Sequence, residues 1–281
     1  MALSVVDLYR DVLPRTNCGD CGFPTCLAFA GMVVAEKHPL DGCPHLDPEV
    51  VARCNRELGV QYAAGKWTRR DLAEDALVWA RERSASMEIA DLPPRIGGTL
   101  ITVAGTRRLK LPYFNDYLLI GNGDITRPDG GEPTRWEKVF VYNHMAQGGR
   151  RMPTGRWKGF EELPNTVSKV KTMAGQVENP LIAHFKGRRE ALQTAAARIG
   201  GRDVTGRENS ADAAFCFHPL PRVPVMLLFW DEDPVDGFGA TVKLLFDETV
   251  TEHLDIESIV FMSERLRQLL GAAPDQCGPD A

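Results

Sequence analysis

Residues 17–26 read NCGDCGFPTC and place Cys18, Cys21 and Cys26 in one short segment of the 281-residue chain. A fourth cysteine, Cys43, follows in the segment GCP at residues 42–44. The resulting spacing, C-x2-C-x4-C-x16-C, groups three thiolates closely in sequence and adds a remote one, which suits the four corners of an iron–sulfur cubane. We therefore expect these four cysteines to hold a [4Fe–4S] cluster.

Two other states of these cysteines stay open. A structural zinc ion is one of them, although zinc usually takes its ligands from two C-x2-C pairs and the second pair is missing here. Free thiols are the other. A disulfide framework is not expected, because four of the seven cysteines fall within 26 residues and a reducing compartment favours metal binding.

The sequence around the cysteines predicts short helices that would cover a cluster. Pro24 suits the first turn of a helix over 25–36, and Cys26 would then lie near its N-terminus, where the helix dipole favours a thiolate and an anionic cluster. A further helix is expected over 48–58, and a short one ends at Pro14. A segment this short has little core of its own, so the cluster is expected to organise it.

The remaining thiols and one histidine have plainer interpretations. Cys54 lies in a predicted helix and is interpreted as a packed thiol. Cys216 lies in an apolar strand and is expected in the core, whereas Cys277 lies in a Gly/Pro-rich tail and is expected to be exposed. His45, two residues after Cys43, either lies on the surface or donates a hydrogen bond to the cluster.

The segment NCGDCGFPTCLAFAG and the later GCPHL closely resemble the N-terminal four-cysteine module of the corrinoid iron–sulfur protein large subunit. The cluster module of the B subunit of the Rnf electron-transport complex is a looser relative. The resemblance covers about residues 4–47 and implies a [4Fe–4S] cluster on Cys18, Cys21, Cys26 and Cys43. In the corrinoid family this module helps to return inactive Co(II) corrinoid to Co(I). The barrel and cobalamin domains of that family are not expected here, because the rest of the chain is too short for both.

The rest of the chain resembles an uncharacterised domain family that often follows such a cluster module in anaerobes. The segments that carry this resemblance are Trp136 and its neighbours, GRW at 155–157, PLPRVP at 219–224, Trp230 with Asp233, and LFD at 245–247. The resemblance implies a boundary between the module and a second domain, and it implies no mechanism.

Composition and charge exclude several classes of protein. Hydrophobic residues make up 43% and charged residues 25% of the chain, which is ordinary for a folded protein and too apolar for disorder. The formal net charge of −5 argues against nucleic-acid binding, which normally needs a basic face. No apolar run is long enough for a membrane span, and the N-terminus lacks the pattern of a signal peptide. We therefore expect a cytoplasmic protein without nucleic-acid or membrane partners.

The order of predicted elements favours an α+β fold, with a small helical [4Fe–4S] module followed by a larger mixed α+β domain. We expect a cluster-binding domain at 1–60, a linker helix at 61–95, an α+β domain at 96–271 and a flexible tail at 272–281. Strands are expected over 99–103, 109–111, 117–120, 213–217, 225–230 and 241–246, and helices over 179–199 and 256–270. The apolar stretch 138–145 suits either a strand or a helix.

The larger domain carries no recognisable catalytic motif. It has no P-loop, G-x-G-x-x-G, H-E-x-x-H or G-x-S-x-G segment, and it lacks the D-x-H-x-x-G motif of base-off cobalamin proteins. Five residues are candidates for a ligand or docking site: His144, Arg150, Arg151, Trp157 and Trp230. His144 is either a ligand or an ordinary core or surface histidine. The basic loop that holds the two arginines, GGRRMPTGRWKG at 148–159, is either a solvated loop or a docking patch for an acidic redox partner.

Three functions fit these features. The first is a one-electron carrier that takes electrons from a ferredoxin-like donor and reduces an acceptor protein, in its sharpest form a corrinoid protein or methyltransferase whose Co(II) corrinoid needs reactivation. The second is an enzyme whose larger domain holds a substrate or a corrinoid, which a pocket lined by Trp136, Trp157 and Trp230 would favour. The third is an interaction or redox-sensor module in which the cluster only orders the N-terminal fold.

Overall fold

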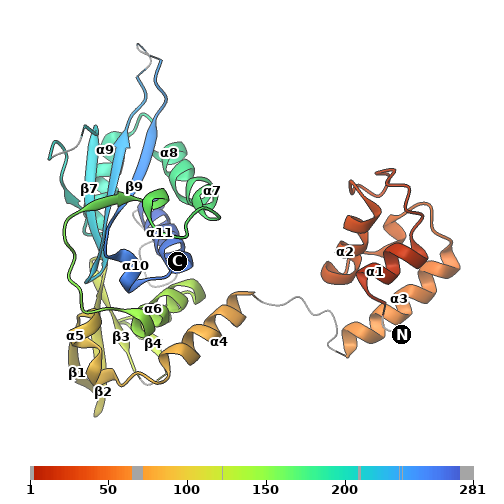
Figure 1. Cartoon of the computed structure of the whole chain (residues 1–281), viewed down its shortest axis with the longest axis horizontal. Helices are drawn as coiled ribbons and strands as arrows, with labels where there is room; N and C mark the ends of the chain where they lie inside the picture. The colour runs from red at the N-terminus through yellow and green to blue at the C-terminus, as the bar shows by residue number, and fades with distance from the viewer. Residues whose placement is uncertain are drawn as a thin grey trace. The chain divides into compact units, whose positions relative to one another are not determined.

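The computed structural model describes residues 3–64, 72–121, 123–207, 210–233, 235 and 237–272. The chain divides into two compact units, Met1–Leu72 (unit 1) and Ala73–Ala281 (unit 2), and Figure 1 colours unit 1 from red to orange and unit 2 from orange to blue. Unit 1 is helical and unit 2 mixes helices with antiparallel sheets, so the predicted α+β class is confirmed. Cys277 and nearly all of the tail predicted at 272–281 lie outside the described residues. No helix in the described part of the chain is long and apolar enough to span a membrane.

Three helices build the described part of unit 1, residues 3–64. They are α1 (Val5–Asp7), which continues into a π-helical turn η1 (Leu8–Val12), α2 (Cys26–Glu36) and α3 (Pro48–Ala63), with a 3-10 turn η2 (Leu40–Gly42) between the last two. Each helix begins at a side chain that accepts a hydrogen bond from a backbone N–H of its first turn: Ser4 for α1, Thr25 for α2 and Asp47 for α3. The predicted helices are thus present, and α3 runs past its predicted end.

The core of unit 1 joins these helices beneath the cysteine loop. Leu8, Phe29 and Leu58 are buried in it and come from η1, α2 and α3 in turn. Cys54 is 1% exposed in the same core, which confirms its interpretation as a packed thiol. The Tyr62 hydroxyl donates to a backbone carbonyl of α2 at 2.6 Å and so holds the last turn of α3 against that helix.

Unit 2 contains two antiparallel sheets. The first is a meander in the order β1 (Thr99–Val103), β2 (Thr106–Tyr113), β3 (Asp116–Ile120) and β4 (Ile125–Thr126). The second has the order β5 (Trp157–Gly159), β9 (Thr241–Asp247), β8 (Val223–Trp230), β7 (Ala213–Leu220) and β6 (Arg202–Asp203). All six predicted strands are present within these elements.

The helices of unit 2 complete its core. They are α4 (Leu72–Ser84), α5 (Pro93–Ile96), α6 (Arg135–Gln147), α7 (Val170–Met173), α8 (Asn179–Phe185), α9 (Arg189–Arg198), α10 (Val250–His253) and α11 (Ile256–Gly271), joined by the turns η3 (Ile89–Asp91), η4 (Phe160–Glu162) and η5 (Ala174–Glu178). The long C-terminal helix α11 packs against α6, α8 and α9. It therefore ties the helices beside both sheets into one domain (Figure 1).

The central strands of the second sheet are covered on both faces. Phe215, Phe217 and Leu227 point into the main core of unit 2. Cys216 and Leu228 point to the opposite face, where they form a smaller cluster. Side chains alternate between the faces of a strand, so a run that is apolar at every position indicates a sheet buried on both sides. Cys216 is 3% exposed, as expected for a core residue.

The single helix predicted over 179–199 is wrong, because the chain breaks it into α8 and α9. Gly187 has a positive φ of 68°, which an α-helix does not accommodate. Its N–H donates to the Asp231 carboxylate at 2.7 Å, so a contact from the end of β8 holds the break. The ambiguous stretch 138–145 is helical and lies within α6.

Candidate functional site

Four of the five cysteines of unit 1 come together from two segments, residues 18–26 and Cys43. Cys18 and Cys21 lie in the loop before α2, Cys26 is the first residue of α2, and Cys43 caps the 3-10 turn η2. Cys26 and Cys43 are each 6% exposed, Cys21 is half-buried and Cys18 is exposed. Burial raises the pKa of the Cys43 thiol, the His45 backbone N–H beside its sulfur opposes that shift, and the other three cysteines raise the pKa further. The four thiols thus lie within electrostatic range of one another.

The separation of these sulfur atoms can be compared with that of four cysteine ligands around one zinc ion. Four thiolates around one zinc ion, with Zn–S bonds of about 2.3 Å, lie about 3.8 Å apart. Across the described residues, no three of the four cysteine sulfurs come within 4.8 Å of one another. The described residues therefore do not form a closed zinc site on these four thiols, and the one group within that distance combines Cys18 with Asp20 and His45.

Two glycines shape the cysteine loop. Gly19 and Gly22 follow Cys18 and Cys21 and have positive φ angles of 82° and 81°. A Cβ at either position would meet nothing within 4 Å, so the backbone conformation and not the available space calls for glycine. The Gly22 N–H donates to the Gly19 carbonyl at 2.8 Å and closes the turn between the cysteines.

Asn17 fixes the loop to the start of α2. Its side-chain oxygen accepts a hydrogen bond from the Cys26 N–H at 2.8 Å. Asn17 has a φ of 52°, a left-handed conformation that asparagine tolerates better than most residues. The contact ties the loop to the N-terminal end of α2, where the positive end of the helix dipole favours an anionic cluster.

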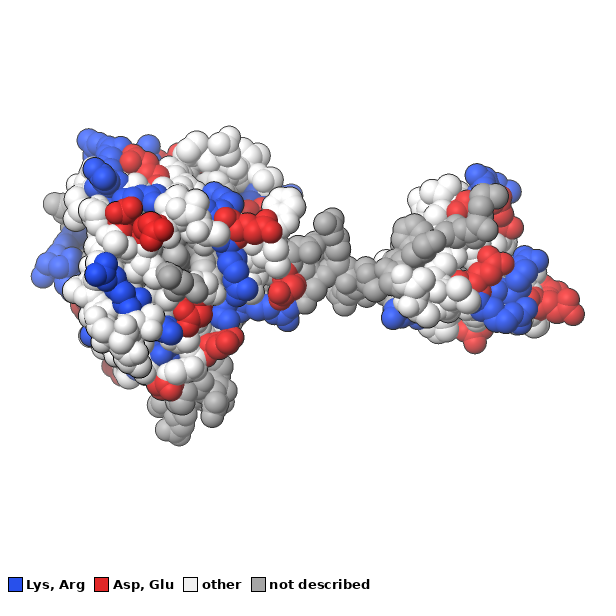
Figure 2. All heavy atoms as spheres, turned by 90° about the horizontal axis from the view of Figure 1, so that it is seen from below, with Lys and Arg blue, Asp and Glu red and all other residues white. Residues whose placement is uncertain are grey.

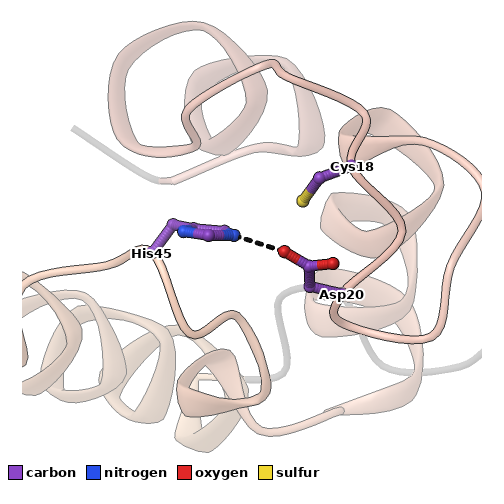
Figure 3. Close-up of side chains that lie close together, drawn as sticks. All are labelled: Cys18, Asp20 and His45. Carbon is purple, nitrogen blue, oxygen red and sulfur yellow. Dashed lines mark hydrogen bonds and ion pairs between the residues drawn. The ribbon is translucent and has the colours of Figure 1, made fainter.

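A polar pair lies beside Cys18 (Figure 3). His45 Nε2 and an Asp20 carboxylate oxygen are 2.6 Å apart, and one ligand atom each from Cys18, Asp20 and His45 all lie within 4.8 Å of one another. His45 is exposed, which agrees with the surface interpretation of this residue. The hydrogen bond from His45 lowers the pKa of Asp20, and the Cys18 thiol adds to the effect. Asp20 was not a candidate from the sequence, although its position between two of the cysteines could have indicated it.

Aromatic rings cover one side of the cysteine site. The ring centroids of Phe23, Phe29 and His38 lie 5.3–5.8 Å apart in tilted and edge-on pairs. Phe29 is fully buried in the core of unit 1, and Phe23 packs against that core. The site therefore has an apolar side next to the core and an open side at Cys18.

Comparisons with known proteins assign both units. Residues 91–269 match the family described as "Domain of unknown function (DUF3786)". The chain belongs to this family. Residues 13–45, ahead of the DUF3786 domain, match a second family described as "Putative Fe-S cluster".

Curated relatives share the iron–sulfur module with this DUF3786 protein. The "Corrinoid/iron-sulfur protein large subunit" of Moorella thermoacetica is 48% identical over 46 residues, which are 16% of this chain and 10% of that protein. The "Acetyl-CoA decarbonylase/synthase complex subunit gamma" of Methanocaldococcus jannaschii is 42% identical over 45 residues, 16% of this chain and 9% of that subunit. The "Acetyl-CoA decarbonylase/synthase complex subunit gamma 1" of Methanosarcina thermophila is 33% identical over 113 residues, which are 40% of this chain and 20% of that subunit.

These matches confirm the predicted resemblance to the corrinoid iron–sulfur protein, and the chain spans about a tenth to a fifth of the length of the relatives named. No solved structure matches the chain. Unit 1 is therefore an iron–sulfur cluster module homologous to the one in those subunits. The looser resemblance to the Rnf B subunit stays a prediction.

His144 is a core residue of the DUF3786 domain. It is fully buried on α6, its Nδ1 lies 3.0 Å from the His253 carbonyl, and the two imidazole rings are 5.9 Å apart. Burial lowers the pKa of His144 to about 4; the bond to the His253 carbonyl opposes this, and the charges of His253, Arg222 and Arg95 add to it. His144 is thus neutral near pH 7 and inaccessible to a surface ligand, so its candidacy as a docking residue is wrong.

We expect this histidine to make the DUF3786 domain sensitive to acid. Its pKa in the folded chain, about 4, lies below the ordinary value of 6.5, so the unfolded chain binds the extra proton as the pH falls between these values. The neutral imidazole of His144 therefore adds about 3 kcal/mol to the free energy of unfolding above pH 6.5. This contribution is lost as the pH falls towards 4. Urea unfolding at a series of pH values should show this loss in the wild type and a shallower one in His144→Gln. Parallel pH profiles for the two proteins would contradict this assignment.

The basic loop at 148–159 is largely balanced by acids. Arg151 lies 2.7 Å from Glu252 and 3.3 Å from Glu248, and Arg156 also pairs with Glu248. Arg150 is exposed. On the face drawn in Figure 2, lysine and arginine side chains are intermixed with aspartate and glutamate. The acids therefore offset the charge of Arg151, and a docking role for Arg150 and Arg151 stays a prediction.

The three tryptophans lie in two separate places within the described residues, so they give no support to the enzyme alternative that a shared pocket would have favoured. Trp136 lies on α6 and stacks on Phe261 of α11, with ring centroids 4.3 Å apart. Trp157 and Trp230 pack on the second face of the five-stranded sheet, beside Cys216. The Trp230 Nε1–H donates to a backbone carbonyl at 3.1 Å. The large cavity of this domain is lined by other residues.

Proposed function

We propose that this protein is a one-electron carrier with a [4Fe–4S] cluster on Cys18, Cys21, Cys26 and Cys43. The approach of Cys43 to the three cysteines of residues 18–26 is the observation that carries the proposal. It is supported by the match of the same residues to an iron–sulfur family and to a subunit whose name pairs a corrinoid with an iron–sulfur centre. When bound, such a cluster accepts and releases one electron at a time.

The residues of unit 1 would set how the cluster is held and reached. Asn17 fixes the loop to the first residue of α2, the α2 dipole favours an anionic group there, and the His45 backbone N–H lies at the Cys43 sulfur. Phe23 and Phe29 keep water from the core side. Cys18 is exposed, so electrons would enter and leave on its side, where a partner can approach closely.

The partners follow from the charge of the site and from the relatives. Four thiolates and the neighbouring Asp20 make the site anionic, and added negative charge opposes reduction and lowers the potential. A low-potential carrier suits a ferredoxin-like donor and an acceptor that is hard to reduce. We propose a Co(II) corrinoid protein of a methyltransferase system as that acceptor. A corrinoid bound by this chain itself stays a prediction.

Asp20→Asn should raise the reduction potential of the cluster, because it removes a negative charge beside Cys18. Two unit charges about 7 Å apart at an effective dielectric constant of about 40 to 80 interact by ~0.6–1.2 kcal/mol, or ~25–50 mV for one electron. Anaerobic spectroelectrochemical titration measures the shift. Glu57→Gln, an exposed change on α3, is the matched control and should move the potential by less than ~10 mV. Equal potentials for wild type and Asp20→Asn would contradict the placement of Asp20 beside the cluster.

Electron delivery tests the function itself. The anaerobic chain, reduced and freed of excess reductant, is mixed with a corrinoid protein in its Co(II) state. One equivalent of chain should convert one equivalent of Co(II) to Co(I), followed by the corrinoid absorbance. If the chain is reduced reversibly but transfers no electron to the corrinoid protein, the proposed acceptor is wrong, and the role as a one-electron carrier still stands. A centre that cannot be reduced reversibly would overturn the carrier.

A further inference from the structure

The DUF3786 domain contains a cavity of about 830 Å³ that none of the candidate residues predicted from the sequence lines. Its wall is formed by the β2–β3 hairpin, the loop after β4, α8, the end of α9 and the end of α11. Sites for small organic ligands commonly measure about 300–1,000 Å³. The cavity is therefore large enough for a metabolite-sized molecule.

Four arginines line this cavity: Arg127, Arg198, Arg265 and Arg267. Arg127 and Arg265 are mostly buried, with side chains 21% and 14% exposed, and they lie 3.0 Å and 2.9 Å from the carboxylate of Glu137. Glu137 itself is 1% exposed and also accepts a hydrogen bond from the Tyr113 hydroxyl at 2.6 Å. Two guanidinium groups thus share one buried carboxylate, which leaves positive charge at this part of the wall.

The other two arginines have donors that the protein does not use. Arg198 donates to the carbonyls of Leu269 and Ala272 at 3.0 Å and 2.8 Å, but its Nε is buried and has no hydrogen-bond partner within the described residues. The Nε of Arg267 is buried and unpartnered in the same part of the structure. A buried donor without an acceptor costs free energy, so acceptor atoms that fill the cavity would be favoured.

The acidic groups near the cavity do not cancel this charge at its inner wall. Asp116 and Asp129 line the cavity but are both exposed, and an Asp129 oxygen already accepts from the Gly131 N–H at 2.9 Å. Glu264 is the acidic neighbour of Arg267 on α11, and it does not line the cavity. His184 also lines it; burial lowers its pKa and the charge of Arg188 adds to that, so it is neutral near pH 7.

Apolar side chains form another part of the wall. Phe114, Leu181, Phe185 and Ile199 face the same cavity as the arginines. An inorganic anion alone would leave this surface without a partner, whereas a neutral apolar molecule would leave the guanidinium groups without one.

We infer that this cavity binds an organic anion that carries a carboxylate or phosphate group on an apolar body. Guanidinium groups bind both headgroups through paired, charge-assisted hydrogen bonds. The inference goes beyond electron transfer and does not depend on the cluster, because every residue that lines the cavity belongs to unit 2.

Calorimetric titration of the cluster-loaded full chain at physiological salt tests this inference. Phenyl phosphate and benzoate supply the two headgroups on an aromatic body, benzyl alcohol supplies the body alone and inorganic phosphate supplies the anion alone. At least one aromatic anion should bind with a Kd of about 1 mM or tighter, and about 10-fold more tightly than benzyl alcohol or inorganic phosphate. The tighter of the two aromatic anions identifies the headgroup. Binding of neither aromatic anion, or equal binding of benzyl alcohol, would overturn the inference.

Matched arginine variants locate the binding. Arg267→Gln removes a cation whose side chain makes no hydrogen bond within the protein as described, and it should weaken the bound anion about 10-fold. Arg267→Lys keeps the positive charge but not the planar guanidinium group, so it should lose less affinity for the anion than Arg267→Gln does. Arg107→Gln, an exposed change on β2, is the control and should bind as the wild type does. Equal weakening by Arg107→Gln and Arg267→Gln would show a general charge effect and overturn the site.

Discussion

Cys26→Ala is expected to strip the iron–sulfur cluster from the protein. Cys26 is 6% exposed and is the only one of the four cysteines at the start of a helix, where the dipole and the Asn17 contact hold its sulfur in place. Loss of one thiolate opens the site to water and removes one of four bonds to the cluster. After anaerobic purification, the iron content should fall below about a tenth of the wild-type value, and the thiolate-to-iron absorbance near ~400 nm should disappear.

Cys54→Ala is the control for that experiment, because Cys54 is a buried thiol in the same core. It should keep the iron and the absorbance, with only a modest loss of stability from the small cavity left by the sulfur. Loss of iron from Cys54→Ala to the same extent as from Cys26→Ala would show that the ligand set is different from the one proposed.

Glu137→Gln should destabilise the DUF3786 domain more than any other single charge change discussed for it. The carboxylate is the shared partner of two largely buried guanidinium groups, Arg127 and Arg265, and its loss leaves both without a counter-charge. Burial would raise the pKa of Glu137, but Arg265, the Tyr113 hydroxyl and Arg127 together lower it, so the group is ionised near pH 7. Removing one partner from a buried ion pair costs about 3–5 kcal/mol in free energy of unfolding.

Urea unfolding of the full chain, followed at the transition of the larger unit, measures this loss. Glu132→Gln is the matched control: Glu132 pairs with Lys138, but its side chain is 74% exposed, so the change should stay within about 1 kcal/mol. A similar loss for both variants would contradict the structural role of the buried network.

The sequence was most informative where structure depends on neighbouring residues. The helix at 26–36 follows from Thr25, whose hydroxyl accepts the Ala28 N–H, and from the apolar run behind Cys26. The cysteine spacing likewise predicts a metal centre, because iron–sulfur ligands recur at short intervals in one segment. These features needed no knowledge of the rest of the fold.

Segments buried on every side were harder to predict. Residues 138–145 show no separate apolar and polar faces, because this part of α6 lies inside the domain. Val139, Val141 and His144 are all buried there. Its periodicity therefore could not separate a helix from a strand. The local signal for a helix was the pair Thr134 and Glu137, which form a capping box at its start.

Contacts between distant segments were not predictable from local patterns. The break at Gly187 depends on Asp231, which comes from the end of a strand far along the chain. Glu137 meets Arg265 only because α6 and α11 pack together, so the arginine-lined cavity had no sequence signal. The ion pairs of the basic loop at 148–159 were not predictable for the same reason, since Glu248 and Glu252 approach it from beyond β9.

Metal analysis of the anaerobically purified full chain tests the central claim most directly. The proposal of a [4Fe–4S] centre predicts about four iron and four acid-labile sulfide per chain, together with one reversible one-electron reduction. About one zinc per chain without labile sulfide, or no metal at all, would contradict it.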